Sequence, residues 1–356
     1  MLELNLENLN IYLVEHFEKV FPKNKKFKIL TTEVINEQTY VNYIFKVKLE
    51  VDNKPLVIYL RQTRDHVKTK PERKLDPTRI RFEAKILKLL NSIQSGVVPE
   101  LLYLDEENNV AFLSDIKRSG KLLVNELIKG NPHIETGEYF GKVIANFHKA
   151  TTGIDHKSVH GDQDKNESAI KFHLGMRLEP ALKMFPVETK ELLHDSQIAK
   201  KCLVLGDLAS KNIFVDKDKI RFLDLERAFV GDPAFDVAFL FCHYLIEITP
   251  EALSKSIEFI RIFLISYFKN LGTTYTKTEK QILENRIIRF LGVTILYRLF
   301  GFYLVVNLER NKEDWKKIAE KLLKSKNGFE TTIFFLKKTK SLRSSEIVDM
   351  YKDNIE

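Results

Sequence analysis

The sequence predicts an α+β fold with two lobes: an N-terminal lobe formed by an antiparallel sheet with one key helix, and a larger, mostly helical C-terminal lobe. Two observations predict this fold. Short or alternating apolar runs, typical of strands, fall before residue 115, whereas apolar residues at helical spacing dominate after residue 236. The chain has 356 residues, 44% of them hydrophobic, which suffices for a sizeable core and suits a pair of lobes. We expect the lobes to comprise residues 1–115 and 116–356.

The first part of the chain has the pattern of a helix followed by strands. Residues 2–20 carry apolar side chains at helical spacing, so we expect an amphipathic helix. Strands are expected at 27–34, 40–51 and 56–60, the second of them with alternating apolar and polar side chains. The turn at 36–39 contains no glycine and is either a polar hairpin turn or a loop that contacts a ligand.

One helix of the N-terminal lobe is indicated by its capping residues. Asp76 is a suitable N-cap and Pro77 is suited to the first helical position. The helix that they begin carries Glu83. Beyond it, residues 101–104 and 110–113 have the pattern of a hairpin.

Polar residues with a distinctive spacing interrupt the apolar runs of residues 203–236. Asp207 and Asn212 lie in a loop between two short strands, and Asp224 and Glu226 follow the next one, where they share a face if that strand continues. A carboxylate can deprotonate a hydroxyl, and an amide with carboxylates can hold Mg²⁺, as phosphoryl transfer requires. Gly-Asp followed by Asn is also common turn chemistry, so this piece alone leaves both interpretations open.

Helices are expected to dominate the second lobe. The clearest one runs over 138–150, where apolar side chains form a single stripe. The charged residues 337–356 are expected to form a tail. Further helices are expected at 121–129, 168–199, 237–247, 250–270, 277–307, 312–325 and 328–335.

Charge and composition argue against several classes of function. The formal charge is +8, but the 57 basic residues are interleaved with 49 acidic ones. Because no Arg-rich block with interleaved aromatic residues occurs, we expect no nucleic-acid partner. The local basic excess at 61–81 could form a positive surface that attracts a polyanion.

The sequence also argues against a membrane partner. The apolar run 237–246 is shorter than the roughly 20 residues that a spanning helix needs, and the first ten residues lack the basic start of a signal peptide. Cys202 and Cys242 lie in apolar runs and are expected to be buried free thiols. We therefore expect a cytoplasmic protein, and the oligomeric state stays open.

The motif of residues 203–236 resembles that of the aminoglycoside phosphotransferase and choline kinase-like superfamily, relatives of protein kinases that phosphorylate small molecules. The family pattern is His-Gly-Asp-x-x-x-x-Asn, then Asp-x-Asp or Asp-x-Glu, then Pro-x-x-Asp at a helix start. Leu205 stands where the family usually has His. The matching residues are Gly206, Asp207, Asn212, Asp224, Glu226, Pro233 and Asp236, and the family segment Gly-x-x-x-Ala-x-x-His is matched by Gly141, Ala145 and His148.

The resemblance implies a bilobal, protein-kinase-like fold with a nucleotide-binding N-terminal lobe and a catalytic, substrate-binding C-terminal lobe. It implies an ATP- and Mg²⁺-dependent kinase acting on a hydroxyl of a small sugar-like, aminoglycoside-like or amino-alcohol metabolite. Asp207 would be the catalytic base, Asn212 and Asp224 the magnesium ligands, and Glu226 a residue for the second ion. Asp236 would accept backbone amides of the catalytic loop, and a buried, hydrogen-bonded role is expected for His148.

In the N-terminal lobe, residues 33–45 resemble the corresponding loop of methylthioribose kinases. Arg61 stands where the kinase pattern usually has Lys, and in this it resembles choline and ethanolamine kinases, which also have Arg at this point. Glu83 would hold Arg61 so that its guanidinium positions the phosphates of ATP. The alternative is an exposed strand-end Arg61 and a helix-surface Glu83. Ser114 and Ile116 fall at the hinge, where backbone groups of kinase-like proteins meet adenine.

Three arginines are candidates for binding the acceptor. Arg286, Arg289 and Arg298 lie at near-helical spacing in an apolar stretch, so each is either paired with a structural acid or directed at a ligand. Methylthioribose kinases have adjacent arginines near this point, whereas this chain has Tyr297-Arg298. The rival hypothesis for the whole chain is a pseudokinase-like protein that binds nucleotide without catalysis, motivated by the glycine-free turn, Leu205 and Arg61.

Overall fold

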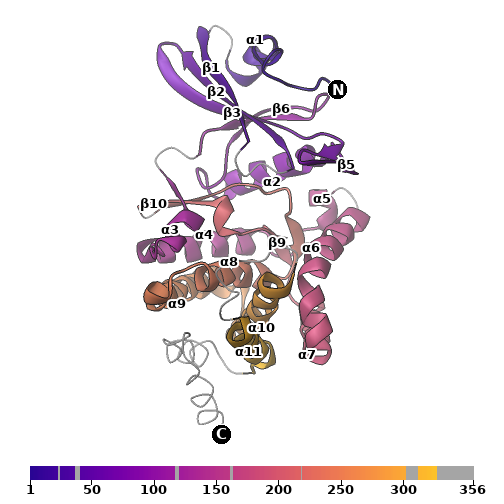
Figure 1. Cartoon of the computed structure of the whole chain (residues 1–356), viewed down its shortest axis with the longest axis vertical. Coiled ribbons are helices and arrows are strands. Elements are labelled where there is room, and N and C mark those ends of the chain that lie inside the picture. The colour runs from indigo at the N-terminus through magenta and orange to yellow at the C-terminus, as the bar shows by residue number, and fades with distance from the viewer. Residues whose placement is uncertain are drawn as a thin grey trace. The chain divides into compact units, whose positions relative to one another are not determined.

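The computed structural model divides into two compact units, Met1–Arg118 and Ser119–Glu356, whereas the sequence placed the boundary after residue 115 (Figure 1). The backbone is described for residues 1–22, 25–36, 41–116, 120–160, 163–217, 219–301 and 312–326, and the side chains of 160, 163–169 and 171–174 are left aside. The turn predicted at 36–39, apart from its first residue, and the helix predicted at 328–335 lie outside these ranges.

Unit 1 is built on a five-stranded antiparallel sheet with the strand order β1-β2-β3-β7-β6. The expected strands are present, because each has apolar residues that one face of the sheet can bury. The sequence missed a short hairpin made of β4 (His66–Val67) and β5 (Lys70–Lys74), whose strands lack an apolar pattern. The sheet strands are β1 (Phe27–Ile35), β2 (Tyr43–Val51), β3 (Lys54–Gln62), β6 (Leu101–Asp105) and β7 (Val110–Ser114).

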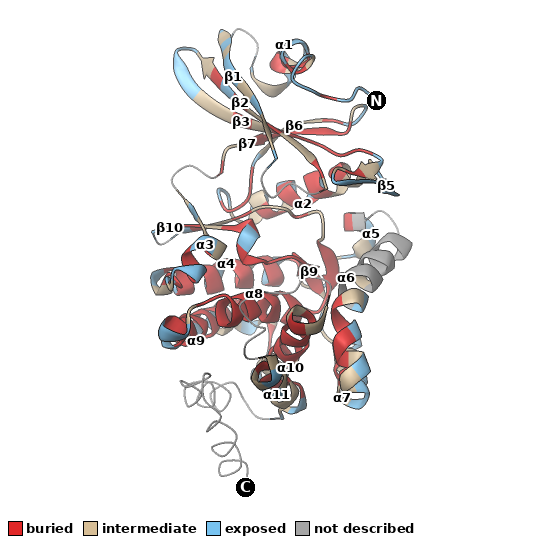
Figure 2. Cartoon of the chain, viewed as in Figure 1, coloured by how far each residue is buried: buried red, intermediate tan, exposed pale blue. Residues whose placement is uncertain are grey.

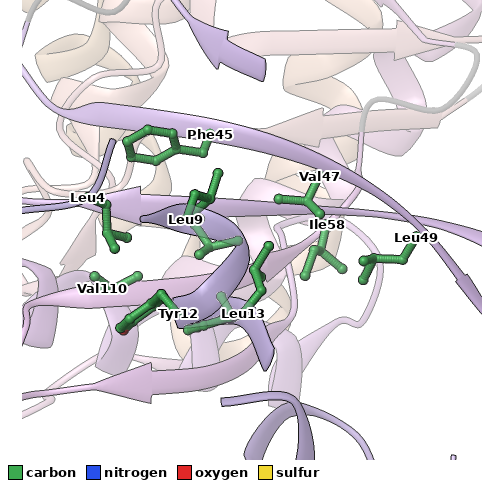
Figure 3. Close-up of a cluster of buried hydrophobic side chains, with 11 residues drawn as sticks. Leu4, Leu9, Tyr12, Leu13, Phe45, Val47, Leu49, Ile58 and Val110 are labelled. Carbon is green, nitrogen blue, oxygen red and sulfur yellow. The ribbon is translucent and has the colours of Figure 1, made fainter. Parts of the chain in front are cut away.

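The N-terminal segment packs on one face of this sheet (Figure 3). The helix α1 (Leu9–Val20) begins later than the predicted residue 2. The preceding residues take another course because the fully buried Gln62 side chain binds them: it accepts from Leu4 N at 3.0 Å and donates to Leu2 O at 2.6 Å. The segment and the strands share one hydrophobic cluster, formed by Leu4, Leu9, Tyr12, Leu13, Phe45, Val47, Leu49, Ile58, Leu60, Val110 and Phe112.

Removing one buried side chain of α1 is expected to destabilise unit 1. Leu9 is 0% exposed, so Leu9→Ala should lower the free energy of unfolding by about 2–5 kcal/mol, because the lost contacts leave a cavity. The matched control Ile11→Ala lies on the same helix but is 64% exposed, and it should change stability by less than about 0.5 kcal/mol. Urea unfolding of both variants measures the difference, and equal effects would contradict the packing of α1 on the sheet.

The helix α2 (Arg79–Ile93) begins three residues after its predicted N-cap, Asp76. The Asp76 carboxylate still organises this start, since it accepts from the N–H of Thr78 at 2.8 Å and from its hydroxyl at 2.7 Å. The helix directs Glu83 inward, where its side chain is buried.

Unit 2 is mostly helical, with three short strands β8 (Lys121–Leu122), β10 (Ile213–Asp216) and β11 (Lys219–Phe222) in one sheet. A separate pair joins β9 (Cys202–Val204) to β12 (Phe229–Gly231). The helix predicted at 138–150 is confirmed as α4 (Gly137–Ala150). It packs closely on α9 (Leu253–Leu271): a Cβ at Gly141 would lie only 2.3 Å from Phe263 O, so a larger residue would push the two helices apart.

The remaining helices follow most of the predicted segments, but the helix at 156–160 was not predicted, residues 121–122 of the helix predicted at 121–129 form a strand, and the helix predicted from 168 begins at 163. The single helix predicted at 168–199 is two helices, because Pro186 at the start of α7 prevents α6 from continuing. The described part of the helix predicted at 277–307 ends at Phe300. These helices are α3 (Leu123–Ile128), α5 (His156–His160), α6 (Gln163–Met184), α7 (Pro186–Gln197), α8 (Ala234–Ile246), α10 (Lys277–Phe300) and α11 (Lys312–Lys324), with single 3₁₀ turns η1 (Ile134–Thr136), η2 (Ser210–Asn212), η3 (Pro250–Ala252) and η4 (Gly272–Thr274).

The core of unit 2 surrounds α8, which is buried along its whole length (Figure 2). A helix that is apolar on all sides needs neighbours on all sides, and α8 has them in α9 and α10. Its first turn carries Asp236, which is fully buried and therefore has to find partners inside the unit. Within the described ranges, no helix is long and apolar enough to cross a membrane.

Candidate active site

The loop between β9 and β10 carries the predicted catalytic base. Asp207 and Asn212 are both buried, and the Asn212 amide donates from Nδ2 to Asp207 O at 3.1 Å and to Asp207 Oδ2 at 3.2 Å. The 3₁₀ turn η2 closes the five-residue interval between them, so the spacing seen in the sequence becomes a direct contact. The structure therefore brings together a carboxylate and an amide, as the sequence predicted.

Asp236 binds the start of this loop from the first turn of α8. Its carboxylate accepts from Leu205 N at 2.6 Å and from Gly206 N at 2.9 Å, and both are backbone amides of the catalytic loop, as expected for Asp236. Buried backbone N–H groups need such partners, because an unsatisfied donor costs about 1–3 kcal/mol. The loop is held by its main chain, so the side chain at position 205 need not supply this bracing.

Behind Asp236 lies the histidine of α4. His148 is fully buried; its Nε2 is 3.3 Å from Asp236 Oδ2 and its Nδ1 is 2.9 Å from the Tyr267 hydroxyl. Burial raises the pKa of Tyr267 well above its usual value, so the hydroxyl stays protonated. The structure places His148 in a supporting position, in agreement with the buried role expected for it.

Gly206 adopts a conformation that excludes other residues. Its φ is +78°, and a Cβ there would lie 2.1 Å from Arg227 O. Gly206→Ala is therefore expected to displace the loop and to abolish most activity. Gly153→Ala is the matched control: φ is +76° but nothing lies within 4 Å of the added Cβ, so it should cost only about 1 kcal/mol from backbone strain. Thermal unfolding and phosphoryl transfer of the two variants test this, and equal losses would contradict the steric argument.

The acidic pair Asp224 and Glu226 lies beyond the end of β11. The strand ends at Phe222, and Asp224 has a φ of +62°, so the condition for the two acids to share a strand face is not met. The left-handed conformation reverses the chain direction locally and ends the pleat. Leu223 N nevertheless donates to Asn212 O at 2.8 Å, which keeps this turn beside the catalytic loop. Asp224 and Glu226 are half-buried on either side of the buried Leu225.

The donor set of this turn fits a magnesium ion in its chemistry. Asn212 uses Nδ2 for Asp207, and no described residue donates to its Oδ1. An amide oxygen together with the nearby Asp224 carboxylate provides the hard oxygen ligands that Mg²⁺ prefers. Within the described ranges, no three His, Cys, Asp or Glu side chains converge in a metal cluster, and the binding of Mg²⁺ by Asn212 and Asp224 stays a prediction.

Arg177, a residue of α6 that contacts the catalytic loop, was not predicted from the sequence. Its Nη2 is 2.9 Å from Asp207 Oδ1 and its Nη1 donates to Gly206 O at 2.6 Å. Burial lowers the pKa of Arg177, and the negative charge of Asp207 opposes this effect. Nothing in the sequence of α6 distinguishes Arg177 from the other basic residues, so no signal was available to find it.

A second buried network attaches the turn η2 to the helices. The Glu247 carboxylate accepts from the Ser210 hydroxyl and lies 2.7 Å from His243 Nδ1 and 3.2 Å from Arg298 Nη2. Burial acts to raise the pKa of Glu247, but His243 and the hydrogen bonds outweigh it and hold the pKa below its usual value. The network connects η2 to the end of α8 and to α10. It too was missed, because Ser210, Arg298 and the pair formed by His243 and Glu247 are far apart in sequence.

Unit 1 contains the second predicted pair. Arg61 at the end of β3 and Glu83 on α2 are both buried, and Arg61 Nη1 is 3.0 Å from Glu83 Oε1. The alternative of an exposed strand-end charge and a helix-surface Glu is thereby wrong. The role of the pair in binding phosphates stays a prediction.

The predicted hinge residues are placed at the end of unit 1. Ser114 N donates to Glu100 O at 3.0 Å, and its hydroxyl accepts from Glu100 N at 2.9 Å, so its amide is already engaged by the protein. Ile116 is buried. Their contact with adenine stays a prediction.

The three arginines proposed for the acceptor each have a carboxylate partner. Arg286 is buried against Asp232, with Nε 2.7 Å and Nη2 3.3 Å from its carboxylate. Arg289 lies 2.9 Å from Asp195 and also donates to two backbone carbonyls, and Arg298 pairs with the buried Glu247. Of the two interpretations that the sequence left open, these contacts favour structural pairing over acceptor binding.

The two cysteines are free and buried, as expected. Burial raises the pKa of the Cys242 thiol to about 12, and it also raises that of Cys202 well above its usual value. Both thiols are therefore protonated and unreactive at neutral pH.

Comparison with known proteins agrees with this arrangement. Residues 48–258 match the phosphotransferase enzyme family. The chain belongs to this family. The matched range contains Arg61, Glu83, Asp207, Asn212 and Asp224, whereas α10 and its arginines lie outside it. The expected family resemblance is confirmed, and with it the assignment of the chain as an enzyme that transfers phosphoryl groups to small molecules.

Individual relatives are distant. A methylthioribose kinase of Bacillus cereus is 23% identical over 326 residues, which cover 79% of this chain and 81% of the relative. Among solved structures, an ethanolamine kinase of Plasmodium vivax shares the fold with a TM-score of 0.51 at 15% identity, covering 97% of this chain and 90% of the kinase. A choline kinase of Streptococcus pneumoniae is 15% identical with a TM-score of 0.45, covering 89% and 99%. The predicted fold class, a kinase-like α+β fold, is confirmed.

Proposed function

We propose that this phosphotransferase is an ATP- and Mg²⁺-dependent kinase that transfers the γ-phosphate to a hydroxyl of a small polar metabolite. The observation that carries the proposal is the contact between Asp207 and Asn212 in a loop that Asp236 holds by its backbone. A carboxylate fixed in this way can orient a hydroxyl and accept its proton.

In the proposed reaction, the acceptor oxygen forms the new bond to the γ-phosphorus as the bond to the β-phosphate oxygen breaks. The hydroxyl proton passes to the Asp207 carboxylate. Asn212 and Asp224 would hold Mg²⁺, with Glu226 available to a second ion, and the bound metal would neutralise the charge that develops on the phosphate oxygens. Arg61, held by Glu83, would orient the phosphates as a bidentate donor.

The relatives suggest which acceptors to test first. Because several of them are named methylthioribose kinases, methylthioribose is the first candidate, followed by choline, ethanolamine and aminoglycosides. Arg286, Arg289 and Arg298 each contact a protein carboxylate, so we assign none of their guanidinium groups to the acceptor. Acting on soluble metabolites, the enzyme would work in the cytoplasm, where Cys202 and Cys242 remain reduced.

The test is phosphoryl transfer by purified protein with Mg·ATP and each acceptor, followed by a metabolite extract read by mass spectrometry. Wild type is expected to give a phosphorylated product that Asp207→Ala does not give, and removal of Mg²⁺ with EDTA should stop the reaction. If wild type gives no product while it still binds ATP, the rival hypothesis of a nucleotide-binding protein without catalysis takes its place, and equal product from both proteins would contradict the role of Asp207 as the base.

A further inference from the structure

Arg177 contacts the catalytic loop at two points with one guanidinium. One Nη atom donates to the carbonyl of Gly206 at 2.6 Å, and the other is 2.9 Å from the carboxylate of the next residue, Asp207. The rigid fork of arginine makes both bonds at once, which fixes the distance between a backbone group and a side-chain group. The rotamer of Asp207 is therefore coupled to the position of its own main chain.

The loop is held from both sides at this point. The amides of Leu205 and Gly206 donate to Asp236, and the carbonyl of Gly206 accepts from Arg177. Asp236 belongs to α8 and Arg177 to α6, so two elements from different parts of the chain enclose one peptide segment. In the catalytic loop, Asp236 contacts only backbone amides, whereas Arg177 also contacts the side chain of the predicted base, Asp207.

Aromatic rings of α8 define where the guanidinium lies. The Arg177 Cζ atom is 4.3 Å from the ring centre of Phe239 and 5.2 Å from that of Phe235. Arginine stacks favourably on such rings, and they restrict its movement. Arg177 is 2% exposed, so neither solvent nor a bound acceptor is its main partner.

A buried arginine is a costly way to achieve stability alone. Removing a guanidinium from water is unfavourable, and a well-packed apolar residue would often stabilise the fold equally well. The Nε atom of Arg177 is buried without a hydrogen-bond partner among the described residues, so the side chain is committed to its two Nη contacts. One of these contacts is with the Gly206 carbonyl and the other with the Asp207 carboxylate.

We propose that Arg177 is a positioning residue that sets the orientation of the Asp207 carboxylate, and that it braces the catalytic loop from α6 in addition to the backbone contacts of Asp236. This inference rests on the proposed role of Asp207 as the base. Arg177 acts through Asp207, so its loss lowers the rate of transfer without weakening the binding of ATP. A lysine keeps one of the two contacts, since a single ammonium cannot reproduce the fork.

The kinetic test compares Arg177→Met and Arg177→Lys with wild type in Mg·ATP turnover, using whichever acceptor of the panel is phosphorylated. We expect kcat to fall about 100-fold in Arg177→Met and less in Arg177→Lys, because small misplacement of a catalytic group has effects of this size. The KM for ATP should stay within about twofold. The control Arg261→Met removes a half-exposed arginine that pairs with Glu258 on α9, and it should leave kcat unchanged.

A double-mutant cycle separates positioning from general destabilisation. If Arg177 works through Asp207, the variant Asp207→Asn with Arg177→Met should be no slower than Asp207→Asn alone. Rate losses that multiply, or a kcat of Arg177→Met within about twofold of wild type, would overturn the inference. The Lys variant keeps the test decisive if the Met variant fails to fold.

A second readout does not depend on turnover. Hydrogen exchange followed by mass spectrometry should show faster exchange of the amides in residues 203–212 in Arg177→Met, with α9 unchanged. Unchanged exchange in the loop would refute the bracing role. Faster exchange together with no phosphorylated product from wild type would refute the proposed function instead and leave the bracing of the loop supported.

Discussion

Asp207→Asn is expected to slow phosphoryl transfer by about 10²–10⁴-fold, the usual contribution of a general base. The side chain keeps its size, so the acceptor and ATP should bind with little change in KM. Initial rates with Mg·ATP and the acceptor measure the effect. Glu258→Gln is the control, because it neutralises a half-exposed carboxylate on α9 and should leave the rate unchanged.

The same substitution should also lower stability. It leaves the buried Arg177 without a negative partner, and loss of one member of a buried ion pair costs about 3–5 kcal/mol. Combining Asp207→Asn with Arg177→Met removes both charges and should recover part of the lost stability without recovering activity. Full activity in Asp207→Asn would show that another group takes the proton.

Asp232→Ala is expected to lower the free energy of unfolding by about 3–5 kcal/mol. Asp232 is buried and binds Arg286 through both oxygens, and it accepts from Ala234 N at 3.0 Å at the start of α8. Its removal leaves a buried guanidinium unpaired and removes a capping interaction of the helix that carries Asp236. Urea or thermal unfolding measures this loss.

The comparison with Arg286→Met decides what this arginine does. If Arg286 is structural, as its contacts favour, its loss should lower stability and leave the KM for the acceptor unchanged. If the KM for the acceptor rises at least tenfold in Arg286→Met while stability stays at the wild-type level, Arg286 binds the acceptor instead. An exposed pair serves as the reference, since Arg261→Met should change stability by less than about 1 kcal/mol.

Several elements could be predicted because their causes are local. Apolar periodicity placed the strands of unit 1 and helix α4, and the five-residue spacing of Asp207 and Asn212 placed both in one loop. The contact between Arg61 and Glu83 also came from the sequence, through the family pattern. One condition that the sequence left open was decided by the backbone: the strand ends at Phe222 and Asp224 is left-handed, so the strand does not continue through Glu226.

The start of α1 shows how a distant residue overrides a local pattern. Residues 2–8 were predicted to be helical as part of the segment 2–20, yet the Gln62 side chain binds their backbone from 58 and 60 residues away. Hydrogen bonds to the buried amide replace those that a longer helix would make. The pattern of apolar residues within the segment does not indicate that Gln62 is its partner.

The sequence by itself determined which residues could carry the chemistry: a carboxylate and an amide five residues apart, two acids after the next strand, and an Arg with a Glu in the first unit. Only the tertiary structure decided what holds them. Asp236 reaches Leu205 across 31 residues and Arg177 reaches Asp207 across 30, and three arginines proposed as ligands turn out to have protein carboxylates beside them. The physical reason is that a buried charge takes the nearest opposite charge in space, and packing of helices, which sequence spacing does not encode, sets that distance.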